Sequence, residues 1–130
     1  MDELIQDLKC FDAVVDALFG TGLDREVDGI FKQVIEAVNL YSKYTISVDI
    51  PSGINSDTGI KMGCAVLANE TVTFGTAKLG LLINDGREYS GTVYIDNISI
   101  PKACIDEEGL KIITNYGEFP KSLLKKDIMT

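Results

Sequence analysis

Histidine and tryptophan are absent from this chain of 130 residues. Without histidine the chain cannot form a Ser-His-Asp or Cys-His catalytic site, and most transition-metal sites lose a common ligand. Positive charge is also scarce, because 12 Lys and Arg residues face 20 Asp and Glu residues, which gives a net charge of -8. Binding to the phosphate backbone of DNA or RNA requires clustered positive charge, so we expect no nucleic-acid partner. Any catalysis must use carboxylates, lysines, hydroxyls or backbone groups.

Long hydrophobic runs are missing as well. No apolar stretch approaches the ~20 residues of a membrane span, and the first methionine is followed by two acidic residues, unlike a signal peptide. The three cysteines, Cys10, Cys64 and Cys104, are odd in number and far apart, which predicts reduced core thiols instead of a disulfide framework or a zinc site. We therefore expect a cytoplasmic protein that does not bind membranes.

The order of predicted elements favours an α/β fold in a single domain. Apolar spacing predicts a helix over Asp2 to Lys9 and a second, amphipathic helix that begins at an Asp28 cap and contains Phe31, Val34, Ile35, Val38 and Tyr41. Apolar, β-branched runs predict strands over Phe11 to Phe19, Thr45 to Ile50, Asn69 to Gly75, Gly91 to Ile100 and Leu110 to Thr114. Residues 84–91 read as a turn-rich connection. The resulting βαβ unit predicts a parallel sheet that is covered on both faces.

Two motifs follow the predicted strands, at the sheet edge where α/β proteins bind ligands. In VDALFGTGLDRE, Asp16 lies in an apolar strand, and Gly20 and Gly22 allow a ligand to approach the backbone. In VDIPSG, Asp49 ends a strand, and Ser52 offers a hydroxyl before Gly53, which permits a positive φ. Because adjacent strands end together, we expect both motifs to lie in one site.

Each motif also has a plain structural interpretation. A lone GxG is more often a tight turn than a nucleotide site, and Asp49 with Ser52 could simply close a turn. Asp16 could be a buried residue bonded to backbone amides, although burial of an acid favours a functional role. Lys78 has the features of a solvated loop lysine. The first motif also resembles motif I of S-adenosylmethionine-dependent methyltransferases, with Asp49 in the place of the ribose ligand.

Four segments in this order, FDAVVDALFGTGLDREVDG, ISVDIPSGINSDTG, ANETVTFGTAKLGL and GTVYIDNISIP, resemble the NAD(P)H-hydrate epimerase family, also called the YjeF N-terminal domain. The resemblance spans roughly residues 11–101. It implies a Rossmann-like three-layer αβα sandwich with a largely parallel sheet. The implied activity interconverts the R and S forms of hydrated NADH and NADPH for nicotinamide nucleotide repair, and it outranks the methyltransferase interpretation.

The resemblance also implies a set of site residues. Asp16 and Ser52 would hold a potassium ion, and Asp49 would contact the hydrated nucleotide and act in catalysis. The implied substrate-binding turn comprises Gly20, Thr21, Gly22, Leu23, Asp24, Arg25 and Glu26. Epimerisation at a carbon that bears a hydroxyl and the ring nitrogen needs reversible loss of water or ring opening, so a carboxylate that accepts and donates protons suits the reaction.

The family's phosphate loop, of the pattern G-x-N-N-G-G-D-G, has no counterpart in this sequence. We therefore expect residues 1–115 to be the carboxyl-terminal part of the domain, with impaired activity in isolation. Residues 116–130 would be a linker or tail towards an NAD(P)H-hydrate dehydratase domain, fused or as a partner. A homodimer and a non-catalytic nucleotide-binding or interaction module stay open. Glu26 and Asn69 depart from the family pattern, which commonly has proline and aspartate there.

Overall fold

The computed structural model of the chain describes residues 1–101, 103 and 104. Its elements, in chain order, are α1 (Asp2–Cys10), β1 (Val14–Asp16), α2 (Gly29–Tyr41), β2 (Thr45–Val48), β3 (Glu70–Phe74), the 3-10 helix η1 (Leu79–Leu81), α3 (Asn84–Tyr89) and β4 (Thr92–Asp96). The strand predicted over residues 110–114 and the linker predicted over residues 116–130 lie outside the described residues. In the part that is described, no helix is both long and apolar enough to span a bilayer.

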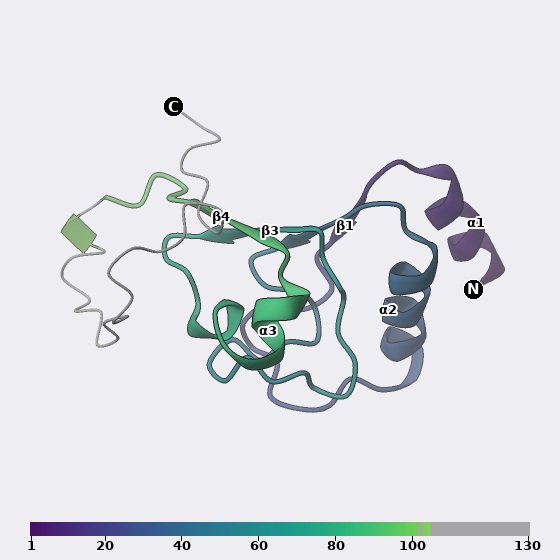
Figure 1. The fold of residues 1–130 in the computed structure, drawn as a ribbon, viewed down its shortest axis with the longest axis horizontal. Coiled ribbons are helices and arrows are strands. Elements are labelled where there is room, and N and C mark those ends of the chain that lie inside the picture. The colour runs from purple at the N-terminus through teal and green to yellow at the C-terminus, as the bar shows by residue number, and fades with distance from the viewer. Residues whose placement is uncertain (102, 105–130) are drawn as a thin grey trace.

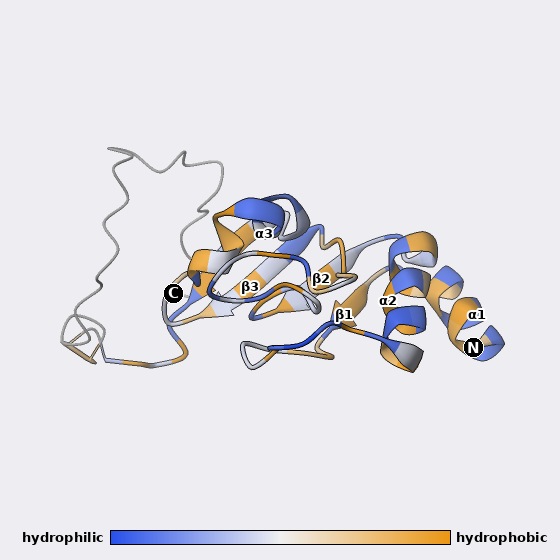
Figure 2. Cartoon of the chain, turned by 90° about the horizontal axis from the view of Figure 1, so that it is seen from below, coloured by the Kyte–Doolittle hydropathy of each residue, from blue (hydrophilic) through white to orange (hydrophobic). Residues whose placement is uncertain are grey.

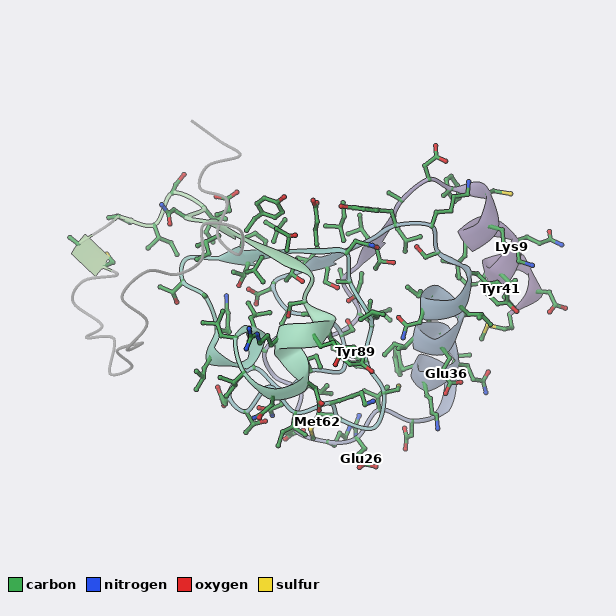
Figure 3. The ribbon with its side chains drawn as sticks, in the orientation of Figure 1. Lys9, Glu26, Glu36, Tyr41, Met62 and Tyr89 are labelled. Carbon is green, nitrogen blue, oxygen red and sulfur yellow. The ribbon has the colours of Figure 1, made fainter. Side chains whose placement is uncertain are left out.

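The four strands form one parallel sheet in the order β1-β2-β3-β4. In Figure 1 the strands run along the upper edge of the molecule, α3 lies below them, and α1 and α2 stand together beside β1. The Lys9 ammonium lies 4.7 Å from the ring centre of Tyr41, which joins α1 to α2 (Figure 3). The predicted βαβ unit and the α/β fold class are confirmed.

Burial alternates along the strands, so the sheet has one buried face and one partly exposed face. Both apolar clusters of the core reach the sheet through its buried face, at Val14 and Val93. Figure 2 places α3 on one side of the sheet. On the opposite face Val15 is 64% exposed. We expected both faces of the sheet to be covered. In the described residues the core covers one face, and the opposite face is partly exposed.

The centre of the buried face is polar. Asp16 lies beside Ser47 and Ser47 beside Thr71 in the register of β1, β2 and β3, and all three are buried. The hydroxyl of Thr71 donates to the carbonyl of Ser90 at 2.8 Å. In the described residues, every buried side-chain nitrogen or oxygen has a hydrogen-bond partner, so this polar centre is fully satisfied.

The strands that carry the motifs are shorter than predicted. β1 ends at Asp16 because side chains capture the next amides: Leu18 N–H donates to Asp16 Oδ1 at 3.4 Å, and Phe19 N–H donates to Ser52 Oγ at 2.9 Å. β2 ends at Val48 because Asp49 takes a φ of 69°, outside the extended region. Both strands therefore end where the site begins.

Helix α2 begins after Asp28, as predicted, although the Asp28 side chain makes no capping hydrogen bond. The turn predicted over residues 84–91 is wrong, because α3 forms there. Gly86 explains the difference: its N–H donates to Gly59 O at 2.8 Å, and it packs so closely on Gly80 that a Cβ would overlap the Gly80 carbonyl oxygen. Tertiary contact, not apolar periodicity, stabilises this short helix.

The three cysteines are free thiols, but the expectation that they lie in the core is wrong for two of them. Cys10 and Cys104 are exposed, and Cys64 is half-buried against the α2 side of the core. Cys10 is exposed because it forms the last residue of α1, where the chain leaves the core.

Candidate active site

Asp16 lies at the end of β1 and is 4% exposed. Its Oδ2 accepts hydrogen bonds from the Ser47 hydroxyl at 2.7 Å and from the backbone N–H of Ser52 at 2.9 Å. Its Oδ1 accepts only the 3.4 Å bond from Leu18 N–H. The acid predicted from the sequence thus anchors the VDIPSG segment to the end of β1.

Ser52 joins the same anchor to the glycine turn. Its hydroxyl oxygen accepts from Phe19 N–H at 2.9 Å and lies 3.4 Å from the Phe19 carbonyl oxygen, to which the hydroxyl donates. Ser52 is fully buried, and both of these bonds join it to Phe19, the residue directly before Gly20. Asp16, Ser52 and the start of the glycine turn therefore lie together in the structure, as expected.

Two further residues of the same loop bind the glycine turn, and the sequence reasoning did not single them out. Asn55 Nδ2 donates to the Leu23 carbonyl at 3.2 Å, and the Ser56 hydroxyl donates to the Thr21 carbonyl at 3.2 Å. Ser52, Asn55 and Ser56 therefore hold alternate carbonyls of the turn. The signal available in the sequence was the run of polar residues directly after VDIPSG.

The two glycines of the turn have unusual surroundings. No atom lies within 4 Å of the position that a Cβ would take at Gly20 or Gly22, and neither residue has a positive φ. Gly53 is the opposite case: its φ is 101°, as the sequence predicted, and a Cβ there would overlap the Cys64 carbonyl oxygen. The fold requires glycine at position 53 but gives no reason for glycine at positions 20 and 22.

The rest of the predicted substrate turn faces solvent. Asp24, Arg25 and Glu26 are exposed, and the chain re-enters the core at Val27, whose N–H donates to Met62 O at 2.9 Å. Figure 3 shows Glu26 and Met62 near one another at the lower edge of the molecule, away from α1. The side chains at 24–26 are thus free to contact a ligand.

Asp49 forms a separate polar group at the ends of β2 and β3. Its Oδ1 accepts from Lys78 Nζ at 2.5 Å, from the Thr73 hydroxyl at 3.1 Å and from Phe74 N–H at 3.4 Å. It makes no hydrogen bond to Asp16, to Ser52 or to residues 20–26, all of which the structure describes. The site therefore consists of two groups that the 49–52 segment connects.

The partners of Asp49 set its protonation state. Burial of the carboxylate raises the pKa of Asp49, but the hydrogen bond and charge of Lys78, with smaller effects of Thr73 and Phe74, outweigh it. The net pKa of Asp49 is lowered, so the group is a carboxylate at neutral pH. The interpretation of Lys78 as a solvated loop residue is wrong, because its side chain is 22% exposed and all three of its ammonium protons have acceptors.

The oxygen atoms around Asp16 suit a hard monovalent cation. A buried carboxylate without a counter-ion is costly, and the ion pairs of the described residues do not include Asp16. Ser52 Oγ and the Phe19 carbonyl add oxygen donors next to it. Across residues 1–101, 103 and 104, no cluster of three or more His, Cys, Asp or Glu side chains could hold a metal, so hydroxyl, carbonyl or water oxygens would complete such a site.

Comparison with known proteins assigns the chain to a family. The family model described as "YjeF-related protein N-terminus" matches residues 1–80. The chain belongs to this family. The match includes the glycine turn, VDIPSG and Lys78, so the YjeF-related assignment rests on the segments that build both polar groups.

Curated proteins give the same result. The chain is 50% identical over 112 residues, 86% of its length, to the "Bifunctional NAD(P)H-hydrate repair enzyme Nnr" of Thermofilum pendens. It is 46% identical over 87 residues, 67% of its length, to the "NAD(P)H-hydrate epimerase" of Levilactobacillus brevis. It is 49% identical over 84 residues, 65% of its length, to that of Limosilactobacillus reuteri. The chain spans 21%, 40% and 40% of the lengths of these relatives.

Proposed function

We propose that this chain forms one wall of an NAD(P)H-hydrate epimerase site, which interconverts the R and S forms of hydrated NADH and NADPH. Two observations support the proposal: the membership in the YjeF-related family and the relatives that are named NAD(P)H-hydrate epimerase. The observation from the fold that carries it is the open space at Gly20 and Gly22. The two glycines leave the backbone of the turn open, so a ligand can lie directly against it.

In this proposal Asp49 transfers the proton. The substrate carbon bears a hydroxyl and the ring nitrogen, so inversion proceeds through reversible loss of water or ring opening, and a carboxylate can take a proton and return it. Lys78 keeps Asp49 in the ionised form at neutral pH, and this is the form that can accept a proton. The turn at residues 20–26 contacts the nucleotide through its backbone and through Asp24, Arg25 and Glu26.

We further propose that Asp16 and Ser52 hold a potassium ion. The ion would supply positive charge beside the nucleotide and offset the buried Asp16 carboxylate. The support is the set of oxygen donors at Asp16, Ser52 and Phe19 and the lack of a protein cation paired with Asp16 in the described part of the chain.

We propose that the protein works in the cytoplasm beside an NAD(P)H-hydrate dehydratase, which is either fused to it or separate; a homodimer stays open. The free thiols support a reducing compartment. The name of the Thermofilum pendens relative, a bifunctional repair enzyme of which the match covers 21%, supports a second catalytic domain. Size-exclusion chromatography with light scattering tests the homodimer.

A pair of glycine variants tests the proposed function. Gly22→Val adds a side chain to open space, so we expect unchanged thermal stability and weaker binding of NADPH hydrate by calorimetry. Gly29→Ala is the matched control: its surroundings are open too, but its φ of 55° disfavours a side chain, so stability falls and binding stays. Unchanged binding in Gly22→Val would contradict the proposal.

Asp49→Asn separates the epimerase from a non-catalytic nucleotide-binding module. In the full-length protein, loss of interconversion with retained binding of the hydrate supports catalysis. Binding of S-adenosylmethionine, with none of the hydrate, would instead support the methyltransferase interpretation, which the family membership disfavours.

A further inference from the structure

The two carboxylate oxygens of Asp49 have different surroundings. Oδ1 accepts all three hydrogen bonds that the carboxylate makes to described residues, from Lys78, Thr73 and Phe74. Oδ2 accepts none of them. Since no buried side-chain oxygen in the described residues lacks a partner, Oδ2 is in contact with solvent. The carboxylate is therefore held by one oxygen and presents the other.

Lys78 supplies the charge that holds Oδ1. Its ammonium donates to Asp49 Oδ1 at 2.5 Å, to the Thr73 hydroxyl at 3.0 Å and to the Phe74 carbonyl at 2.9 Å. A lysine has three protons to donate, so none is left for a substrate. Thr73 is fully buried, and this fixes the position of the ammonium. Lys78 can act on a substrate only through Asp49.

The backbone brings the two residues together from different strands. Asp49 follows β2 with a φ of 69°, and its N–H donates to Val72 O in β3 at 2.7 Å. Gly75, with a φ of 71°, turns the chain after β3, and Lys78 precedes η1. Both segments follow neighbouring strands at the same edge of the parallel sheet, and the ion pair links them there.

We propose that Lys78 is the positioning residue of the epimerase site, where it locks Oδ1 of Asp49 so that Oδ2 alone faces the substrate. This proposal rests on the proposed function. In each catalytic cycle Oδ2 accepts the proton of the substrate hydroxyl while the bond from that carbon to the ring nitrogen breaks, which leaves an aldehyde and an electron pair on the nitrogen. The nitrogen then attacks the other face of the aldehyde and Oδ2 returns the proton to the oxygen, so no net proton is consumed. Lys78 holds Asp49 as a carboxylate at the start of each cycle and fixes its orientation throughout.

Carboxyl-carbon NMR on the full chain tests the ion pair without any activity measurement. The variants are Lys78→Met, Lys78→Arg and the matched control Lys43→Met, which breaks an exposed pair between Lys43 and Asp12 at 3.3 Å. The Asp49 signal is identified by its loss in Asp49→Asn. In Lys78→Met we expect the pKa of Asp49 to rise above that of an exposed aspartate, because burial remains while the cation is gone.

In Lys78→Arg the charge remains, so we expect the pKa of Asp49 to stay below that of Lys78→Met. In Lys43→Met it should not change. An unchanged pKa in Lys78→Met would overturn the proposal. In the wild-type chain, where no substitution can affect folding, the Lys78 ammonium should give a slowly exchanging 15N signal, and rapid exchange with water would equally overturn it.

Addition of NADPH hydrate distinguishes this proposal from the proposed function. If both hold, the Asp49 carboxyl signal moves with the amide signals of residues 20–26, while the Lys78 ammonium signal persists. If the amide signals move and Asp49 does not, Oδ2 does not face the substrate and the Lys78 proposal fails. If no signal moves, the proposed function fails, whatever the titration of Asp49 shows.

Discussion

Asn55 holds the glycine turn with one end of its side chain and its own loop with the other. Its Nδ2 donates to Leu23 O at 3.2 Å, and its Oδ1 accepts from Asp57 N–H and Thr58 N–H, each at 3.0 Å. Asn55→Ala removes all three bonds, whereas Asn55→Asp keeps the two that need an acceptor and loses the one to Leu23. The two variants therefore separate the turn contact from the loop contacts.

The expected losses follow from this count. A neutral hydrogen bond contributes about 0.5–1.5 kcal/mol, and these bonds are part-exposed, so the lower half of that range applies. Asn55→Ala should lower the free energy of unfolding by about 1.5–3 kcal/mol and Asn55→Asp by about 0.5–1 kcal/mol. For a domain of this size, about 4 °C of melting temperature corresponds to 1 kcal/mol, so the shifts should be about 6–12 °C for Asn55→Ala and about 2–4 °C for Asn55→Asp.

Urea and thermal unfolding, followed by circular dichroism, measure these losses, and calorimetry with NADPH hydrate measures binding. Stability should fall from wild type through Asn55→Asp to Asn55→Ala, but both variants should bind the hydrate equally weakly, because both lose the contact to Leu23. Asn97→Ala is the control, since the exposed Asn97 side chain makes no hydrogen bond to the described residues. Wild-type binding in Asn55→Asp would refute the reasoning, as would equal stability of the two variants.

Three other predictions concern pH, potassium and backbone conformation. Because the pKa of Asp49 is lowered by Lys78, the pair stabilises the fold above the unfolded pKa of about 4 and loses this effect as pH falls through the folded value, so the stability gap between wild type and Lys78→Met should close in acid. Potassium chloride should raise the melting temperature above that in lithium chloride of equal ionic strength, and Asp16→Asn should abolish the difference; equal melting in both salts for wild type would contradict a potassium site. Gly53→Ala should unfold the chain at a much lower urea concentration than Gly22→Ala, because its Cβ would overlap the Cys64 carbonyl oxygen; similar midpoints would contradict this account.

The sequence predicted the parts of the fold that depend on local pattern. The apolar spacing of Ile35 and Val38 placed α2, and the β-branched runs placed the strands in a parallel sheet, because periodicity reflects which side is buried. It did not predict α3, whose polar and glycine-containing stretch is helical only because Gly86 packs on Gly80. The predicted strands were also too long. The N–H groups after β1 donate to the side chains of Asp16 and Ser52 instead of to a neighbouring strand.

The sequence likewise predicted one part of the candidate site and not the other. The contact of Asp16 with Ser52 was predictable, because Asp16 ends β1 and Ser52 follows the neighbouring parallel strand β2. The ion pair of Asp49 with Lys78 was not, because the two residues are 29 positions apart and Lys78 reaches Asp49 only after the turn at Gly75. Long-range pairing of this kind leaves no periodic trace in a single sequence.

The left-handed backbone of Asp49 implies a trade-off between stability and activity. Aspartate adopts a φ of 69° more readily than most residues other than glycine, but the conformation still costs about 1 kcal/mol for a residue with a Cβ. A glycine at position 49 would relieve this strain at the expense of the bonds to Lys78 and Thr73. The contacts that hold Asp49 in this conformation are therefore the same contacts that orient the proposed base, so a variant that loosens them would lose both.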